Sequence, residues 1–268
     1  MDKRKTILMS FATATPIGFL GGLMGLGGAE FRLPVLVGIF KYKAHKAIAL
    51  NLAVSLVTII SSLIFRLPST NLNHLFPLWL IILSLLGGSM TGAYMGAYFS
   101  HKVSEASLKT VILLLLVLIG LLMIIEGFYP LVPQSAPAHY TVISTLIGVL
   151  LGLGIGFVSS MLGVAGGELI IPTLILVFGV DIKIAGTASL FISLPTIVIG
   201  ILKHASHGVY QEKKDITDLV LPMGIGSIIG AFLGTSLITR VSGSFMKLLL
   251  GFILIASALK LFLKRNSE

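Results

Sequence analysis

Two carboxylates and one guanidinium stand in stretches that are otherwise apolar and rich in glycine. Glu30 and Arg32 follow the run GLMGLGGA at 22–29, and Glu168 follows GVAGG at 163–167. An ionisable side chain is costly to bury in a transmembrane segment, so each of the three is a functional candidate. For the two glutamates, proton carriage and the ordering of broken backbone stay open as roles. Arg32 could pair with Glu30 or hold an oxyanion through two parallel hydrogen bonds.

The glycines beside these residues are expected to break the helices that contain them. The runs are GLGGAE at 25–30 and GVAGGE at 163–168, and each glycine costs about 1 kcal/mol in a helix interior. Broken backbone in lipid must be covered by protein or line a cavity. Freed N–H groups at the start of the next short helix form a positive end that suits an anion. Pro34 and Pro172 add a kink or fix a helix start one turn later, and we expect the two breaks to face each other.

A second set of glycines is expected to serve packing alone, because small residues every four positions let two helices approach closely. This set comprises Gly88, Gly92, Gly96, Gly226, Gly230 and Gly234. Small polar side chains follow each short apolar stretch, with Asn51 in one place and Ser189 and Ser193 in the other. They could complete a polar binding site or hydrogen-bond between helices, and the sequence leaves both roles open.

The composition places all of these residues in a membrane. Of 268 residues, 56% are hydrophobic and 11% are charged, and the mean hydropathy is +1.05. A helical span needs about 20 apolar residues. Eight runs approach that length: 7–24, 47–65, 75–99, 110–129, 140–162, 184–202, 216–238 and 245–263. The predicted fold class is an all-α polytopic membrane protein, because the alternating ten-residue segments of a transmembrane barrel are absent.

Several other classes of site and partner are excluded or disfavoured by the composition. The chain has no cysteine, which excludes disulfides, thiolate metal sites and cysteine nucleophiles. The formal net charge of +9 is distributed over short loops, which favours a role in membrane orientation over nucleic-acid binding. The histidines lack the spacing of metal ligands, so we expect neither a metal nor a cofactor.

The chain is an internal duplication with a shift of 138 residues. In this register Gly28, Glu30 and Pro34 align with Gly166, Glu168 and Pro172. Further aligned pairs are Ser55 with Ser193, Thr58 with Thr196, Gly92 with Gly230, and Lys109 with Lys247. Arg32 has no basic counterpart, because Ile170 takes its place. We predict a first repeat at 1–129, an external linker at 130–139 and a second repeat at 140–268.

The distribution of basic residues predicts that the two repeats have opposite orientations. Each repeat is read as a hairpin followed by three crossings, with short helices at 29–40 and 168–178 that either span or re-enter. Most of the 19 basic residues then lie on the side of both termini. The opposite side holds Arg66, Lys183, Arg240 and Lys247. The basic excess marks the cytoplasmic side, and this pattern is the inverted-repeat signature of secondary transporters.

The pair of glycine breaks, each followed by a proline and separated by half the chain, resembles the sulfite exporter TauE/SafE family. The resemblance covers about residues 7–263. It implies an integral inner-membrane transporter of small sulfur-containing anions such as sulfite or sulfonates, usually moved outward. Carried over by position, the binding candidates are Gly27, Gly28, Gly166 and Gly167, with Glu30 and Glu168 beside them.

The expected function is therefore a secondary transporter of small anions that works by alternating access, with the lipid bilayer as its other partner and with a homodimer left open. The chain lacks the phosphate-binding run of nucleotide-driven motors. One alternative is a cation/proton exchanger that uses Glu30 and Glu168. Another is an intramembrane enzyme acting on lipid, which would need a nucleophile beside a base. Ser159 and Ser160 have no histidine or arginine beside them in sequence, so no enzyme is expected.

Overall fold

The computed structural model describes residues 3–69, 75–99, 105–131, 141–162, 166–206 and 209–265, and within these ranges the chain is helical with no strand. The helices are α1 (Lys3–Met24), α2 (Ala29–Gly38), α3 (Ala44–Arg66), α4 (Trp79–Phe99), α5 (Glu105–Phe128), α6 (Val142–Leu162), α7 (Gly167–Leu176), α8 (Ile182–Ser206), α9 (Lys213–Asp215), α10 (Leu221–Ser236) and α11 (Gly243–Arg265). Two 3₁₀ turns, η1 (Leu67–Ser69) and η3 (Phe76–Leu78), precede α4, and a π-helical turn, η4 (Ile216–Val220), precedes α10.

Six helical segments in the described part of the chain are long and apolar enough to cross a membrane. They are Lys3–Met24, Lys46–Arg66, Phe76–Gly96, Val142–Ser160, Ile182–Leu202 and Lys213–Ser236. The two other expected crossings, 110–129 and 245–263, coincide with α5 and α11, whose apolar parts are described over Leu113–Phe128 and Gly243–Leu259. Those two crossings and the opposite orientation of the repeats stay predictions. The linker 130–139 lies outside the described residues from 132 onward.

Each expected short helix is present and begins directly after its glycine break. α2 and α7 are ten residues long, two residues shorter than expected for the first and one for the second. Both end in the same way, with a left-handed residue at equivalent positions, Lys41 (φ 56°) and Gly179 (φ 64°). In both, the N–H of the following residue donates to a carbonyl of the helix. Tyr42 N–H donates to Leu36 O at 3.1 Å, and Val180 N–H donates to Leu174 O at 3.0 Å. This hydrogen bond satisfies an otherwise free carbonyl and stops the helix.

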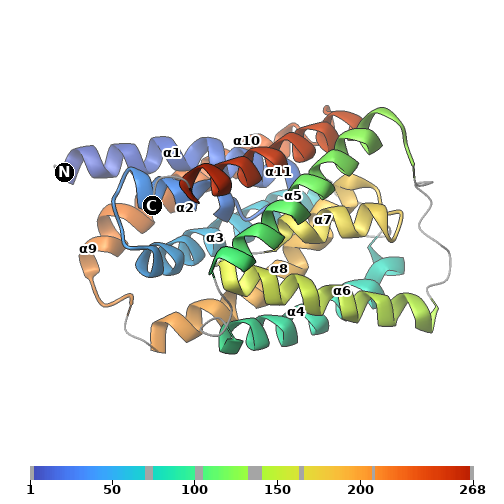
Figure 1. Ribbon diagram of the computed structural model, residues 1–268. Coiled ribbons are helices and arrows are strands. Elements are labelled where there is room, and N and C mark those ends of the chain that lie inside the picture. Colours follow the sequence, from blue (N-terminus) through green and yellow to red (C-terminus); the bar gives the residue numbers. More distant parts are fainter. Residues whose placement is uncertain are drawn as a thin grey trace.

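The helices pack in pairs that join the two halves of the chain. α1 lies along α10, α4 lies along α6, α5 packs against α11 and α3 packs against α8. Figure 1 shows the α1–α10 pair and the α4–α6 pair on opposite sides of the molecule. Under the shift of 138 residues, α1 corresponds to α6 and α10 corresponds to α4. The first helix of each half therefore packs against a later helix of the other half.

The second set of glycines lies in these contacts, which confirms its packing role. A Cβ atom at Gly92 would stand 2.0 Å from Leu153 O on α6, and one at Gly230 would stand 2.1 Å from Thr15 O on α1. Such distances leave no room for a side chain, because the backbones themselves touch. The two pairs of helices are thus in close contact through equivalent glycines.

A buried ion pair that the sequence pattern does not reveal joins α5 to α11. Lys247 Nζ lies 3.0 Å from Glu126 Oε1, and the two residues are 2% and 1% exposed. Leu131 N–H donates to Glu126 Oε2 at 2.6 Å. Both charges are therefore compensated where water is excluded.

Replacing Lys247 alone should destabilise the protein strongly, because it leaves the Glu126 carboxylate buried without a partner. We expect Lys247→Met to cost about 3–5 kcal/mol, measured as a lower midpoint of thermal unfolding in detergent. The double variant Lys247→Met with Glu126→Gln should regain most of that loss, since Gln keeps the acceptor for Leu131. Equal loss in both variants would show that the ion pair is not the stabilising element.

Candidate functional site

The first glycine break separates α1 from α2 by a left-handed backbone that only glycine adopts readily. Gly25 has φ 84° and Gly28 has φ 68°, in a region where other residues are strained. Gly25 also lies against α8, since a Cβ atom there would stand 2.2 Å from Gly186 O. Gly28 immediately precedes α2, so the N–H groups of the first turn of α2 face the break.

The second break repeats this geometry at the equivalent position. Gly166 has φ 80° and immediately precedes α7, as Gly28 precedes α2. A Cβ atom at Gly166 would stand 2.7 Å from Ser159 Oγ. The preceding part of this break, 163–165, lies outside the described residues. Both short helices thus begin at a left-handed glycine in matching positions of the duplication.

The two breaks lie together, as expected from the duplication. Ser189 on α8 donates from Oγ to Gly25 O over 2.6 Å. A Cβ atom at Gly167 would stand 3.6 Å from that hydroxyl and 3.7 Å from Gly25 O. The buried side chain of Leu26 also reaches within 3.3 Å of the same point. The start of α7 is therefore seated on the unwound end of α1.

Arg32 is fully buried on α2 and, within the described part of the chain, donates to neutral groups. Its Nη1 donates to Ser55 Oγ at 2.9 Å and to Asn51 Oδ1 at 3.4 Å. Its Nη2 donates to Thr58 Oγ1 at 3.0 Å and to Ser227 Oγ at 3.4 Å. Of the two roles considered for Arg32, the ion pair with Glu30 is therefore not the arrangement that its hydrogen bonds adopt.

Asn51 links this cluster to the first break. Its amide nitrogen donates to Ala29 O over 2.9 Å, so α3 holds the start of α2. The guanidinium of Arg32 also lies beside the break, since a Cβ atom at Gly28 would stand 3.5 Å from Nη2. A positive group and the N-terminal end of a helix thus lie side by side, and both favour an anion.

The second half has equivalent positions for this cluster but lacks the basic side chain. Ile170 occupies the place equivalent to Arg32, and the positions of Asn51 and Ser55 are taken by Ser189 and Ser193. Ser193 is 2% exposed on α8, and the hydrogen bonds of Arg32 to described residues do not include it. The serines of the second half therefore lack the basic partner that Asn51 and Ser55 have in Arg32.

Glu30 and Glu168 bring the two halves into direct contact. Their side chains lie near enough for each carboxyl to influence the charge of the other, and each stands in the first turn of its short helix. The Oε1 atoms of both carboxyls and the Nε of Arg32 are buried without a hydrogen-bond partner among the described residues. Pro34 and Pro172 lie four residues after the two glutamates, so neither glutamate carbonyl receives the usual helical N–H. The centre thus combines unpaired donor and acceptor atoms.

Arg66, predicted to lie on the side of the membrane opposite the termini, ends α3 and is fully buried, and its side of the membrane stays a prediction. Its Nη1 donates to Gly22 O at 3.2 Å, its Nη2 to Lys183 O at 2.8 Å and its Nε to Thr187 Oγ1 at 3.1 Å. It therefore ties the end of α1 to the start of α8. Nothing in its local sequence distinguishes it from a basic residue that flanks a span, so only the three-dimensional arrangement reveals this role.

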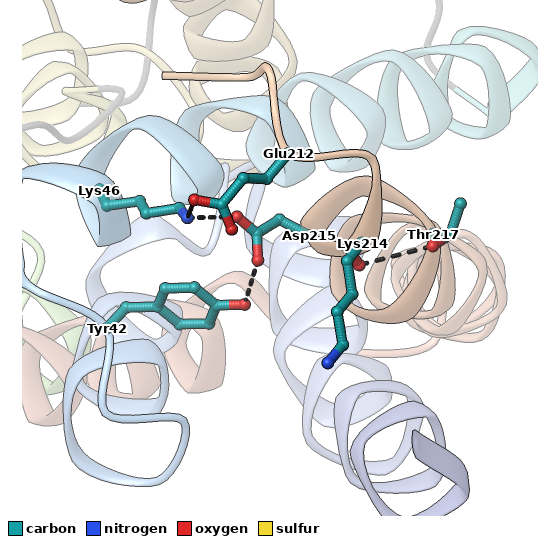
Figure 2. A network of polar contacts seen from close by, with 6 residues as sticks. All are labelled: Tyr42, Lys46, Glu212, Lys214, Asp215 and Thr217. Atoms are coloured by element: carbon teal, nitrogen blue, oxygen red, sulfur yellow. Dashed lines mark hydrogen bonds and ion pairs between the residues drawn. The ribbon is translucent and has the colours of Figure 1, made fainter. Parts of the chain in front are cut away.

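A second polar cluster, the Asp215 network, joins the segment after α2 to the segment before α10 (Figure 2). Lys46 Nζ lies 2.5 Å from Asp215 Oδ2 and 2.7 Å from Glu212 Oε1. The Tyr42 hydroxyl donates to Asp215 Oδ1 over 2.7 Å. Burial, with the hydrogen bond to Asp215 as the next cause, raises the pKa of Tyr42 above its ordinary value, so its phenol stays protonated and keeps donating. In Figure 2 the ammonium of Lys214 points away from this cluster.

Comparison with known proteins matches nearly all of the chain to one family. The family model described as "Sulfite exporter TauE/SafE" matches residues 10–261. A "Probable membrane transporter protein" of Xylella fastidiosa (strain 9a5c) is 27% identical over 266 residues, which cover 95% of this chain and 94% of that protein. "Probable membrane transporter protein YdhB" of Bacillus subtilis (strain 168) is 23% identical over 84% of this chain and 89% of that protein.

A further relative matches only part of the chain. "Probable membrane transporter protein YunE" of Bacillus subtilis (strain 168) is 27% identical over 121 residues, which are 45% of this chain and 42% of that protein. The match to the family model, by contrast, includes both glycine breaks, both short helices and the helices that carry their polar partners. The chain therefore belongs to the sulfite exporter TauE/SafE family of membrane transporters.

Proposed function

We propose that the chain is a secondary transporter of small anions, with sulfur oxyanions or organosulfonates as the substrate class. The carrying observation is Arg32, a fully buried guanidinium whose four hydrogen-bond acceptors among the described residues are all neutral. Glu30 is near enough for its charge to affect Arg32, but none of the hydrogen bonds of Arg32 to described residues goes to a carboxylate. A buried charge without a hydrogen-bonded counter-ion is costly, and a bound anion would supply one. The substrate class comes from the family, and the anionic character is supported by Arg32 and by the N-terminal end of α2.

The substrate site in this proposal lies between the two breaks. Gly27, Gly28, Gly166 and Gly167 would offer backbone N–H groups, and Arg32 would hold an oxyanion. Asn51 and Ser189 fix the backbone on either side, through Ala29 O and Gly25 O. Ser193 completes the polar surface of α8. The burial of these groups and their proximity to one another support this assignment of the substrate site.

Glu30 and Glu168 are proposed to couple transport to protons. Two neighbouring carboxyl groups at the centre of the protein do not both carry a charge readily, because like charges repel each other. The pair would therefore hold a proton that bridges the two halves. Separation of the halves during alternating access would change how tightly that proton is held, which links anion movement to a pH gradient.

The proposed cycle needs a closure on each side of the membrane. The Asp215 network is proposed as the closure on the side of the termini, which we assign to the cytoplasm of a cell with this protein in its inner membrane. Figure 1 supports a common side, since the start of α1 and the end of α11 lie at one end of the molecule. The equivalents of Tyr42, Lys46 and Asp215 in the other half are Val180, Ile184 and Pro77, so this polar closure is not duplicated.

A cation/proton exchanger is the second candidate function, and the proximity of Glu30 and Glu168 is the observation that favours it. Paired carboxylates from two repeats can hold a cation as well as a proton. Arg32 weighs against this function, because a buried guanidinium beside the carboxylates repels a cation. Sodium or potassium flux without any added anion would favour the exchanger.

Removal of the Arg32 charge should abolish most anion transport. We expect Arg32→Gln to weaken the apparent affinity for the transported anion about tenfold to a hundredfold, the usual value of a hydrogen bond to a charged group. The measurement is uptake of sulfite, sulfate, thiosulfate and a sulfonate by proteoliposomes. Arg240→Gln is the control, since Arg240 is exposed and far along the chain from the site. Unchanged affinity in Arg32→Gln would refute the anion site.

Neutralising the carboxyl pair should uncouple transport from the pH gradient without unfolding the protein. We expect Glu30→Gln and Glu168→Gln to remove the stimulation of anion flux by an imposed gradient, while downhill flux persists. The assay is the same proteoliposome uptake at several pH values on both sides of the membrane. Full stimulation in both variants would eliminate the proton role and leave the carboxyls with backbone ordering alone.

Opening the Asp215 network should expose the central site to reagents from the side of the termini. Because the chain has no cysteine, a single Ser193→Cys substitution provides a clean probe for a membrane-impermeant thiol reagent. Adding Asp215→Asn should speed labelling from that side severalfold, because Lys46 and Tyr42 lose their common partner. Lys214→Gln is the matched control. Equal labelling rates in the two double variants would show that the network does not close the path.

A further inference from the structure

A shallow groove lies between the first turns of α1 and the start of α10, away from the paired breaks. Its volume is about 350 Å³, and it is lined by Arg4, Ile7, Leu8, Phe11, Pro222 and Ile225. Arg4 is the one polar residue of this lining, and because the lining surface is almost entirely apolar, Arg4 contributes mainly the aliphatic part of its side chain. Leu8 is 70% exposed and Ile225 is 53% exposed, so the groove opens outward on the surface of the molecule.

The groove lies at one end of two helices that are candidate membrane spans. Both of its walls belong to candidate membrane spans, Lys3–Met24 and Lys213–Ser236. Arg4 stands in the first turn of α1, at the end where the span begins. The apolar wall runs from there along α1 through Ile7 to Phe11. A ligand with a charged head and an apolar tail fits a groove that has a basic residue at one end and an apolar wall beyond it.

The charge at the head of the groove is positive and available. Arg4 is exposed, and it makes no ion pair with any of the described residues. Its neighbour Lys3 lies 3.6 Å from Asp218 Oδ1, and Thr217 donates to the same oxygen over 2.9 Å. The carboxylate that precedes the α10 wall is thus already compensated. Arg4 remains available to bind an anion.

We propose that this groove binds one anionic phospholipid, with its phosphate on the Arg4 guanidinium and an acyl chain against Ile7, Leu8 and Phe11. A guanidinium matches a phosphate with two parallel hydrogen bonds, and basic pockets between transmembrane helices bind acidic lipid heads. α1 and α10 come from different halves of the chain. The lipid therefore bridges the two halves at the edge of the membrane and stabilises their contact.

The test measures lipid binding by the purified full chain in lipid-free detergent micelles. Native mass spectrometry follows titration with phosphatidylglycerol or with phosphatidylcholine of the same acyl chains. We expect wild-type protein to bind the first phosphatidylglycerol about fivefold more tightly than phosphatidylcholine, the effect of one well-placed basic residue. Phosphatidylglycerol should also raise the thermal unfolding midpoint, since a ligand of the folded state stabilises it.

Two variants and one matched control separate a defined site from general charge attraction. Arg4→Gln should remove the preference for phosphatidylglycerol, and Ile225→Trp should fill the groove and weaken the binding of both lipids. Lys5→Gln removes the same charge from the same turn of α1, but Lys5 does not line the groove, so the preference should remain.

Three outcomes would overturn the proposal. The first is an equal loss in Arg4→Gln and Lys5→Gln, which indicates general attraction by the basic N-terminus. The second is unchanged binding in Ile225→Trp, which places the lipid elsewhere. The third is a dimer in which a cross-link at position 8 joins two copies of the protein, because the second copy would then occupy the groove. Each variant is first shown to unfold at the wild-type temperature without added lipid.

Discussion

Broken main chain inside a membrane protein must find hydrogen-bond partners within the protein itself, and here the partners of the first break come largely from outside its own helix. Gly22 O accepts from Arg66 on α3 and from Thr235 on α10. Gly25 O accepts from Ser189 on α8. The unwound end of α1 is therefore stabilised by the second half of the chain as much as by the first. The position of α2, and with it that of Arg32, depends on these bonds.

The duplication supplies a symmetric frame, and single substitutions give that frame its chemistry. Gly28 and Gly166 keep the same left-handed conformation, and the two short helices keep the same length. The difference lies in Arg32, whose equivalent is Ile170. The first half thus carries a buried cation with polar partners, whereas the second half has an apolar residue at the equivalent position. In the proposed anion site, this asymmetry would favour binding on the side of the first half.

The features that the sequence predicted follow from strong, local physical rules. Apolar runs locate helices because a span requires them, and the positions of both short helices followed from glycine runs of high helix cost. The packing glycines were also predictable, since Gly92 and Gly230 recur at helical spacing. The adjacency of the two breaks followed from the duplication. These rules use only residue type and spacing.

The rest depends on side-chain partners that are distant in sequence. Arg66 resembles any basic residue at the end of a span, yet it binds carbonyls from α1 and α8. Glu126 and Lys247 are 121 residues apart, and no periodic pattern links them. Ser227 became a partner of Arg32 only because α10 crosses from the other half. A hydrophobic pattern predicts which face of a helix is buried, but it does not identify the polar group that it meets.

α1 packs against α10 and α4 packs against α6, so each pair joins the two halves of the chain. This pairing has a consequence for how the protein is made. α1 is synthesised about 200 residues before its glycine-bearing partner α10. During synthesis α1 and α4 must wait in the bilayer, or beside the insertion machinery, with their contact faces covered by lipid or by a helper protein. Neither half has the partner helices needed to assemble alone. The α4–α6 pair can therefore form midway through synthesis, whereas the α1–α10 pair can form only after α10 has been made.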